Sequence, residues 1–334
     1  MKKIIVCFII VLLMAFPASA GEVSLNKWVL NVTIGDDGMV EETIQAEFEN
    51  SGTTSIDGFS FVVPASGVVI GSDNIMSIPS TGTEVKQQTI PGGIKISINF
   101  DRPIEAGMKW NGRLSLTAQN WAVKEGPDYS IIIPVDAPKA IIAGKEVEFS
   151  LPSDPEIRSQ VFLPKAVNVT AVEVKSKDKK SYKKLLQFDK MVITWFQLNL
   201  GDEISIKGSY SDILKLIIET DEKSRQIKER IKNAREAGQD VSEAESHLLN
   251  AEEYNNNQAL QSFWINDFKV VQEYVGYAND ELNLAEKSLS EQKETEVIPE
   301  ETEKSNSVPG FGGAGLILII CGYCIKLRRK RSKL

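Results

Sequence analysis

Cysteine is almost absent from this sequence. The three cysteines lie near the ends of the chain, at Cys7, Cys321 and Cys324, so residues 21–307 contain none. Disulfide bonds are therefore excluded from that stretch, and its domains must be stabilised by burial of apolar side chains, as larger secreted domains are. We expect Cys321 and Cys324 to pack as small polarisable side chains in an apolar helix.

Histidine is scarcer still, with His247 as its only example. A histidine-containing zinc site or a Ser-His-Asp triad needs this residue beside suitable partners, and no such motif surrounds it. The sequence also lacks a P-loop and a G-x-G-x-x-G run between a strand and a helix. We therefore expect no enzyme activity, no cofactor, no catalytic or metal-binding residue, and a solvent-facing position for His247.

Adjacent acidic residues are the remaining candidates for chemistry. Three such pairs lie in the strand-like part of the chain before residue 211: Asp36–Asp37, Glu41–Glu42 and Asp202–Glu203. Any of them could supply the carboxylates of a glycosidase, and the pair in the glycine turn could bind calcium through its oxygens. Because the chain has 46 acidic residues, chance neighbours are expected, and we interpret these pairs as solvated surface.

A secretory signal peptide is predicted at the N-terminus. Lys2 and Lys3 precede an uncharged apolar run over residues 4–16, and a small-x-small cleavage site follows. We expect the peptide to span residues 1–20, with cleavage between Ala20 and Gly21. An uncleaved anchor helix is the alternative, but the run is shorter than the roughly 20 residues that a membrane span needs.

A second membrane signal lies at the C-terminus. Residues 308–325 are uncharged, and six basic residues follow between positions 326 and 333. Such basic residues mark the cytoplasmic side of a membrane helix. We therefore expect the chain between the two signals to lie at the cell surface, on the extracellular side of the cytoplasmic membrane, with its C-terminus anchored.

The order of features at this end resembles a known sorting signal. Pro309, Gly310 and Phe311, then a short apolar helix and a basic tail, are similar to the PGF-CTERM signal of archaeal surface proteins. The resemblance implies that an archaeosortase-like enzyme removes this segment and joins the new C-terminus to a membrane lipid. Permanent anchoring in the bilayer by the helix itself is the alternative.

The exported part is strongly acidic. The whole chain has 38 basic and 46 acidic residues, and eight of the basic residues, but no acidic residue, lie in the two terminal signals. The remainder therefore carries a net charge of −16. Because such a surface repels phosphate backbones, nucleic acid is excluded as a partner.

Apolar residues recur with a period of two from about residue 23 to residue 210. Val40, Ile44 and Phe48 alternate with charged and polar residues, as in half-buried strands. Glycine-rich turns separate the runs, and Gly126-Pro127 interrupts the pattern. We predict a mainly β protein with helices, beginning with two antiparallel, Ig-like β-sandwich domains over 21–126 and 127–210. One larger sandwich is the alternative.

The apolar spacing becomes helical from about residue 211. Narrow apolar seams recur every three or four residues, Gly238 ends the first helix, and Asp240 with Glu243 predicts a capping box for the next. A third helix is expected after the asparagines at 255–257. We predict a helical hairpin or three-helix coiled coil over 211–290, a flexible acidic stalk over 291–307, and the PGF motif, membrane helix and basic tail over 308–334.

These features predict a non-catalytic, membrane-tethered cell-surface protein that spaces, scaffolds or binds envelope components. The sequons at Asn31 and Asn168 indicate N-glycosylation, and the helix seams predict homo-oligomers or a helical partner. Tryptophans in the strand region are expected to fill the core. The alternatives are an accessory or substrate-binding subunit of a membrane transporter and an extracellular carbohydrate-active enzyme with a carboxylate pair.

Overall fold

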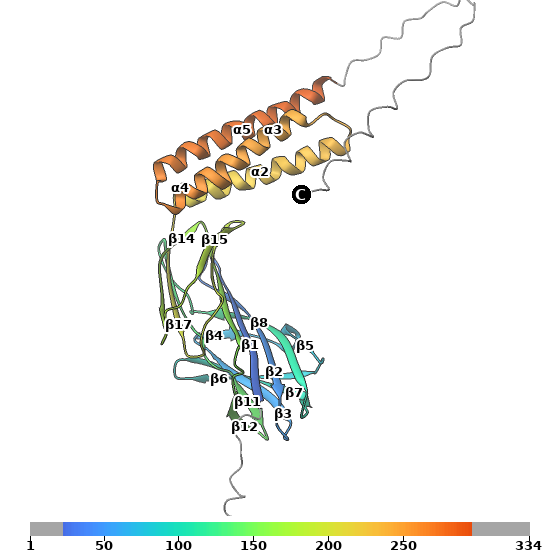
Figure 1. Cartoon of the computed structure of the whole chain (residues 1–334), viewed down its shortest axis with the longest axis vertical. Coiled ribbons are helices and arrows are strands. Elements are labelled where there is room, and N and C mark those ends of the chain that lie inside the picture. The colour runs from blue at the N-terminus through green and yellow to red at the C-terminus, as the bar shows by residue number, and fades with distance from the viewer. Residues whose placement is uncertain (1–22, 296–334) are drawn as a thin grey trace, which may run out of the picture. The chain divides into compact units, whose positions relative to one another are not determined.

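A computed structural model describes residues 23–295, and the side chains as far as residue 291. The described part is mainly β with some helix (Figure 1). The expected signal peptide, its cleavage site at Ala20 and Gly21, and the segment with Pro309, Gly310 and Phe311 lie outside the described residues. No helix within the described range is long and apolar enough to span a bilayer.

The strands form three sheets. The eight-stranded sheet has the order β15-β16-β13-β1-β2-β8-β4, and β5 also pairs with β8. Its strands are β1 (Val23–Ile34), β2 (Val40–Asn50), β4 (Gly67–Val69), β5 (Ile75–Ile78), β8 (Lys109–Gln119), β13 (Glu156–Lys165), β15 (Lys183–Gln187) and β16 (Lys190–Trp195). A 3-10 turn, η1 (Ser72–Asn74), precedes β5.

The two smaller sheets have five and four strands. The five-stranded sheet has the order β12-β11-β3-β7-β6, from β3 (Ile56–Val63), β6 (Thr83–Ile90), β7 (Gly93–Ile104), β11 (Lys139–Ile142) and β12 (Lys145–Glu148). The four-stranded sheet has the order β14-β17-β10-β9, from β9 (Val123–Glu125), β10 (Asp128–Pro134), β14 (Val167–Lys175) and β17 (Glu203–Tyr210).

Strands on both sides of the predicted boundary at residue 126 share sheets. β1 pairs in parallel with β13, and β3 pairs with β11. The predicted division into two antiparallel sandwiches therefore does not coincide with the sheets. The Gly126-Pro127 interruption is instead the tight connection between β9 and β10, which pair as neighbours in one sheet. A local turn signal does not report which distant strands pair.

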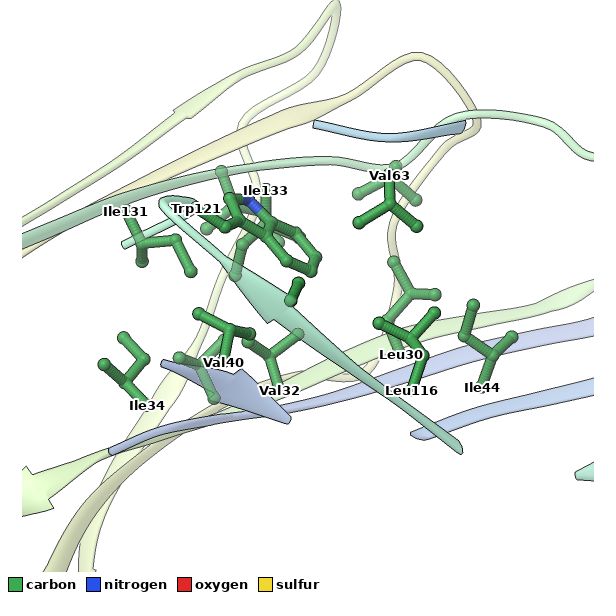
Figure 2. Packing of buried hydrophobic residues seen from close by; sticks show 14 of the residues in the cluster. Leu30, Val32, Ile34, Val40, Ile44, Val63, Leu116, Trp121, Ile131 and Ile133 are labelled. Carbon is green, nitrogen blue, oxygen red and sulfur yellow. The ribbon is translucent and has the colours of Figure 1, made fainter. Parts of the chain in front are cut away.

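The alternation of apolar residues places one face of each strand in a common core. Along β2 every second residue is buried, because successive side chains of a strand point to opposite faces. Residues of all three sheets belong to one apolar cluster. Figure 2 shows part of this cluster, with Trp121 beside Ile131 and Ile133, and with Leu30 beside Leu116.

The chain becomes helical after β17. Ser211 caps the first helix, because its hydroxyl oxygen accepts a hydrogen bond from the amide of Leu214. The helical segments are α2 (Asp212–Glu236), α3 (Ser242–Glu252), the π-helical turn η2 (Glu253–Ala259), α4 (Leu260–Trp264) and α5 (Phe268–Thr295). Residues of the expected seams on α2, α3 and α5 form a second apolar cluster.

One local prediction for the helices is wrong. Asp240 does not form a capping box with Glu243, because its carboxylate accepts hydrogen bonds from the amide and hydroxyl of Ser242. The third helix does follow the asparagines at 255–257, as α5, but these asparagines lie in η2, between α3 and α4. There the side-chain amide of buried Asn255 donates to the backbone oxygen of Ile217 on α2. The chain turns at Ile265–Asp267 before α5.

Candidate functional site

An open cleft of about 690 Å³ lies at one end of the strand region. Its walls come from the segment before and at the start of β13, from the end of β14 and from the connection between β16 and β17. The lining residues are Leu151, Pro155, Ile157, Lys175, Ser176, Lys177, Leu198, Asn199, Leu200, Gly201 and Asp202. Five of them have aliphatic side chains, and the rest supply lysines, small groups, an amide and one acid.

A four-residue turn forms one wall of the cleft. The amide of Asp202 donates to the carbonyl of Asn199 over 3.1 Å, and the Asp202 carboxylate accepts from the amide of Asn199 over 2.8 Å. Gly201 has a φ of 88°, a conformation that glycine adopts without steric cost. The sequence Asn-Leu-Gly-Asp therefore closes on itself, which fixes this wall.

Val135, in the connection after β10, holds this turn against the sheets. Its amide donates to the carbonyl of Asp202, and its carbonyl accepts from the amide of Gly201, each over 2.8 Å. Leu198, just before the turn, donates its amide to the carbonyl of Ile157 over 3.0 Å. Backbone hydrogen bonds thus hold both the turn and Leu198 of the cleft in place.

Lysine ammonium groups determine the charge at the cleft. Lys175 and Lys177 are exposed at its edge, while Lys180 lies 3.8 Å from the carboxylate of Asp202, with 9% and 4% of the two side chains exposed. Among the described residues that line the cleft, Asp202 is the only acid, and Lys180 balances its charge. The residual charge of the lining is therefore positive.

The cleft lies beside a lysine-rich segment that stands out in an acidic chain. Residues 175–184 contain six lysines and one acid, Asp178. The sequence patterns did not predict this site, because the net charge of the whole exported part hides a local cluster of lysines. The local charge over ten residues reveals the lysines, although the apolar floor comes from segments distant in sequence.

A second unusual position is Glu42 on β2, which is only 4% exposed. It lines a small cavity of about 20 Å³ together with Asp136 and apolar residues that include Trp28, Phe61 and Trp121. Burial raises the pKa of its carboxyl from 4.5 to about 8, because a charged carboxylate is disfavoured away from water. Glu42 is therefore a neutral acid at neutral pH.

The structure separates the acidic pairs noted in the sequence. Glu41 is exposed whereas Glu42 is buried, because neighbours on a strand face opposite ways. Asp202 is buried in the turn before β17, where its carboxylate bonds the amide of Asn199, whereas Glu203, the first residue of β17, is only partly buried. Neither pair presents two carboxylates to one site.

The pair in the glycine turn has a structural role. The carboxylate of Asp37 accepts a hydrogen bond from the amide of Met39, which closes the turn between β1 and β2. The carbonyl of Asp36 accepts from the ammonium of Lys124 and the hydroxyl of Tyr129. Across residues 23–291, no group of three or more His, Cys, Asp or Glu side chains is arranged to hold a metal ion.

His247 is not the solvent-facing residue that we expected. Its Nδ1 lies 2.7 Å from a carboxylate oxygen of Glu281 on α5, and 24% of the side chain is exposed. This hydrogen bond, with a second one from Asn250, lowers the pKa of Glu281. The histidine joins two helices, and nothing in its surroundings resembles a catalytic triad.

The predicted sequons both lie on strands. Asn31 is partly buried in β1, between β2 and β13. Asn168 lies on β14, where its amide oxygen is buried without a hydrogen-bond partner. N-glycans usually occupy surface loops, so glycosylation at these two positions stays a prediction. Four tryptophans fill the strand core as predicted, each at most 7% exposed: Trp28, Trp110, Trp121 and Trp195.

No protein-family model and no curated protein matches the sequence. Among solved structures, the chain is similar to an M1 zinc metallopeptidase from Deinococcus radiodurans, with a TM-score of 0.34, 11% identity, and coverage of 57% of this chain and 44% of that one. A putative protease from Parabacteroides distasonis matches with a TM-score of 0.37 and 12% identity over 79% and 59% of the two chains. Native leukotriene A4 hydrolase from Saccharomyces cerevisiae matches with a TM-score of 0.35 and 7% identity, over 58% of this chain and 31% of that one.

This comparison corrects the functional prediction. We expected a non-catalytic surface protein that spaces, scaffolds or binds envelope components, whereas the matched structures are peptidases and a hydrolase. That prediction is therefore not retained. The chain spans less than two thirds of the length of each matched structure, and at TM-scores of 0.32–0.37 the likeness does not establish enzymatic activity.

Proposed function

We propose that the cleft beside β13 and β14 binds a small amphipathic anion, a molecule with an apolar body and a carboxylate or phosphate head. The observation that carries this proposal is the combination of an aliphatic floor with the exposed ammonium groups of Lys175 and Lys177 at its edge. A volume of about 690 Å³ lies within the range of small-molecule sites.

The two parts of such a ligand contribute unequally to its affinity. Burial of apolar surface is favourable by about 0.8 kcal/mol for each methylene group, which is about fourfold in affinity at full burial. An exposed ion pair contributes only about 0–1 kcal/mol. We therefore expect the chain to supply most of the affinity and the lysines to select an anionic head over a neutral one.

Isothermal titration calorimetry of the folded protein tests this proposal with four probes below their micelle concentrations. Decanoate and decyl phosphate carry both parts of the ligand, decanol carries only the chain, and acetate carries only a head. We expect binding of the two amphipathic anions, weaker binding of decanol and none of acetate. Tighter binding of one anion identifies the head group. Equal affinity for decanol and decanoate, or no binding of any probe, would refute the proposal.

Variants locate the binding. Lys175→Gln combined with Lys177→Gln should reduce the affinity for decanoate severalfold and leave that for decanol unchanged. Leu200→Asp should abolish binding of both, because it places a charge on the apolar part of the cleft wall. The matched control is Lys86→Gln combined with Lys145→Gln, which removes two exposed lysines from the five-stranded sheet. Equal loss in this control would show that only overall charge matters.

We also propose that the chain works outside the cell. The signal-like N-terminus and the PGF-like C-terminus support this placement. Mass spectrometry of the protein from its native membrane tests it. The expected products begin at Gly21 and end in a lipid-modified residue near Pro309. Peptides that extend beyond Cys324 would instead favour permanent anchoring by the helix in the bilayer.

We infer further that the three sheets stack as one larger β-sandwich and that α2, α3 and α5 supercoil together. The single apolar cluster shared by the sheets supports the first inference, and the small, regularly spaced residues of the second cluster support the other. Leu282→Asp with Leu289→Asp should then lower the helical circular dichroism of the chain. Unchanged helicity would contradict the coiled coil. The same seams are the proposed route to a second copy or a helical partner.

A further inference from the structure

Glu42 lies where residues of all three sheets meet. Its cavity is lined by Trp28 of β1, Phe61 of β3 and Pro134 of β10, which belong to the eight-, five- and four-stranded sheets respectively. No hydrogen bond or ion pair joins the Glu42 carboxyl to another of the residues 23–291. A buried, unpaired acid is costly to keep, and its position at this junction calls for an explanation other than stability.

The cavity has room for one small polar guest. A volume of about 20 Å³ is enough for a single water molecule, which can bond a neutral carboxyl. Asp136 is the other titratable residue that lines the cavity, and it is exposed. The strand neighbours of Glu42 are Val32 on β1 and Leu116 on β8, both apolar. Every facing group therefore opposes ionisation of Glu42, and none neutralises the anion.

Two short connections lead from this cavity to the cleft. Pro134 and Asp136 line the cavity, and Val135 between them makes both hydrogen bonds that hold the turn with Gly201 and Asp202. Across the sheet, Trp28 of the cavity is the register partner of Ile157, which lies in the cleft floor. Each segment thus has a residue at the cavity and a backbone contact with a residue that lines the cleft.

We infer that Glu42 is a proton-binding site that controls the cleft, an inference that rests on the proposed binding of an amphipathic anion there. With the proton bound, the neutral carboxyl and one water fit this small cavity. When the proton is released to solvent, the carboxylate requires more hydration than a cavity of about 20 Å³ can hold. The junction then opens, and the displacement of Val135 and Trp28 loosens the turn and floor of the cleft. Ligand binding and protonation of Glu42 therefore favour each other.

The first experiment measures the response of the cavity around Glu42 to pH, without any ligand. Trp28 and Trp121 both line the cavity, so tryptophan fluorescence should change in one proton-linked transition as pH rises through the pKa of Glu42. Glu42→Gln and Glu42→Leu should abolish the transition, and Glu41→Gln, on the opposite face of the same strand, should leave it intact. Persistence of the transition in both Glu42 variants, or its absence in the unmodified protein, would refute the site.

The second experiment measures the coupling between ligand binding and protonation of Glu42. The affinity for decanoate should fall on the order of 5- to 10-fold between about pH 6 and about pH 9, a range in which carboxylate probes and lysines keep their charge. In Glu42→Gln the affinity should stay at its high value throughout. If decanoate binds with the same pH dependence in both proteins, the coupling is wrong while the proposed function stands. If decanoate binds neither at any pH, the proposed function itself fails, whatever the fluorescence reports.

Discussion

The strand region and the helical region of this chain bury their apolar side chains in different ways. In the strands, large rings meet in one place, and Phe48 contacts the rings of Phe59, Phe100 and Trp110 at centroid distances of 4.8–6.2 Å. In the helices, the shared cluster consists largely of alanine, leucine and isoleucine along narrow seams. The strands therefore concentrate stability in a few side chains, whereas the helices distribute it along their length.

Polar contacts differ in the same sense. Ion pairs connect the helices at several points, including Lys228 with Glu252 and Arg230 with Glu286. Such exposed pairs contribute little individually to stability. Their role is to align helices whose apolar seams are narrow. The strand core has the opposite feature, a buried acid without a partner at Glu42. The comparison teaches that the two regions place charged groups differently: the helices pair them at the surface, whereas the strand core encloses a carboxyl whose burial disfavours its charged form.

The largest effect is expected for Phe48→Ala in the strand core. Phe48 is 1% exposed and stacks on Trp110, so its removal leaves a cavity that rigid sheets cannot close. We expect unfolding to become easier by about 3–5 kcal/mol, measured by chemical denaturation of the full chain. Phe188→Ala is the control, because that ring is 68% exposed and its loss should cost less than about 1 kcal/mol. Similar losses in both variants would contradict a concentrated core.

Glu42→Gln should act in the opposite direction at neutral pH. The folded-state pKa of about 8 lies above the ordinary value of 4.5, so between these values the unfolded chain loses a proton that the folded chain keeps. The stability of the unmodified protein therefore falls as pH rises through this interval and levels off above it.

The Glu42→Gln variant does not lose stability in this way, because its side chain does not titrate. Since each pKa unit corresponds to about 1.4 kcal/mol, the advantage of Glu42→Gln over the unmodified protein should grow by about 3 kcal/mol from pH 4.5 to about pH 7. Denaturation at several pH values measures it, with Glu41→Gln as the control. A constant difference between variant and parent across the interval would contradict the raised pKa.

Leu282→Ala tests the helical seam with a smaller expected effect. Leu282 is fully buried, but the helices can shift to fill part of the space, so we expect a loss toward the lower end of the usual range, about 2–3 kcal/mol. The matched control is Leu284→Ala, two residues along the same helix, where the leucine is 44% exposed. This substitution should lower the stability by less than about 0.5 kcal/mol. A loss larger than that of Phe48→Ala would reverse the comparison between the two regions.

Local patterns predicted the elements well, because their causes are local. The alternation along β2 correctly gave the buried face of that strand, and the seam from Val271 to Leu289 is buried as its spacing required. Ser211 caps α2 at the predicted start of the helical region. In each case the residues that decide the structure are neighbours on one strand or one turn of helix.

Long-range pairing and the candidate sites were beyond the sequence, because their causes are distant. Nothing near Trp28 indicates that β1 pairs in parallel with β13, more than a hundred residues later. The same pairing brings Ile157 to the cleft floor. Glu42 was noted only as the neighbour of Glu41. Its alternation with buried Val40 and Ile44 could have predicted a buried acid, but not the cavity that surrounds it.

The smallest effect is expected at the polar contact between α3 and α5. Hydrogen bonding by His247 lowers the pKa of Glu281, so this contact stabilises the fold above the ordinary pKa of the glutamate, 4.5, and is lost as pH falls below it. His247→Ala should therefore cost about 0.5–1 kcal/mol near neutral pH and progressively less in acid. A double-mutant cycle with Glu281→Gln isolates the contact from the packing of each side chain. A coupling energy of zero at neutral pH would mean that the helices are aligned by their seam alone, and one that survives in strong acid would mean that the contact does not depend on the charge of Glu281.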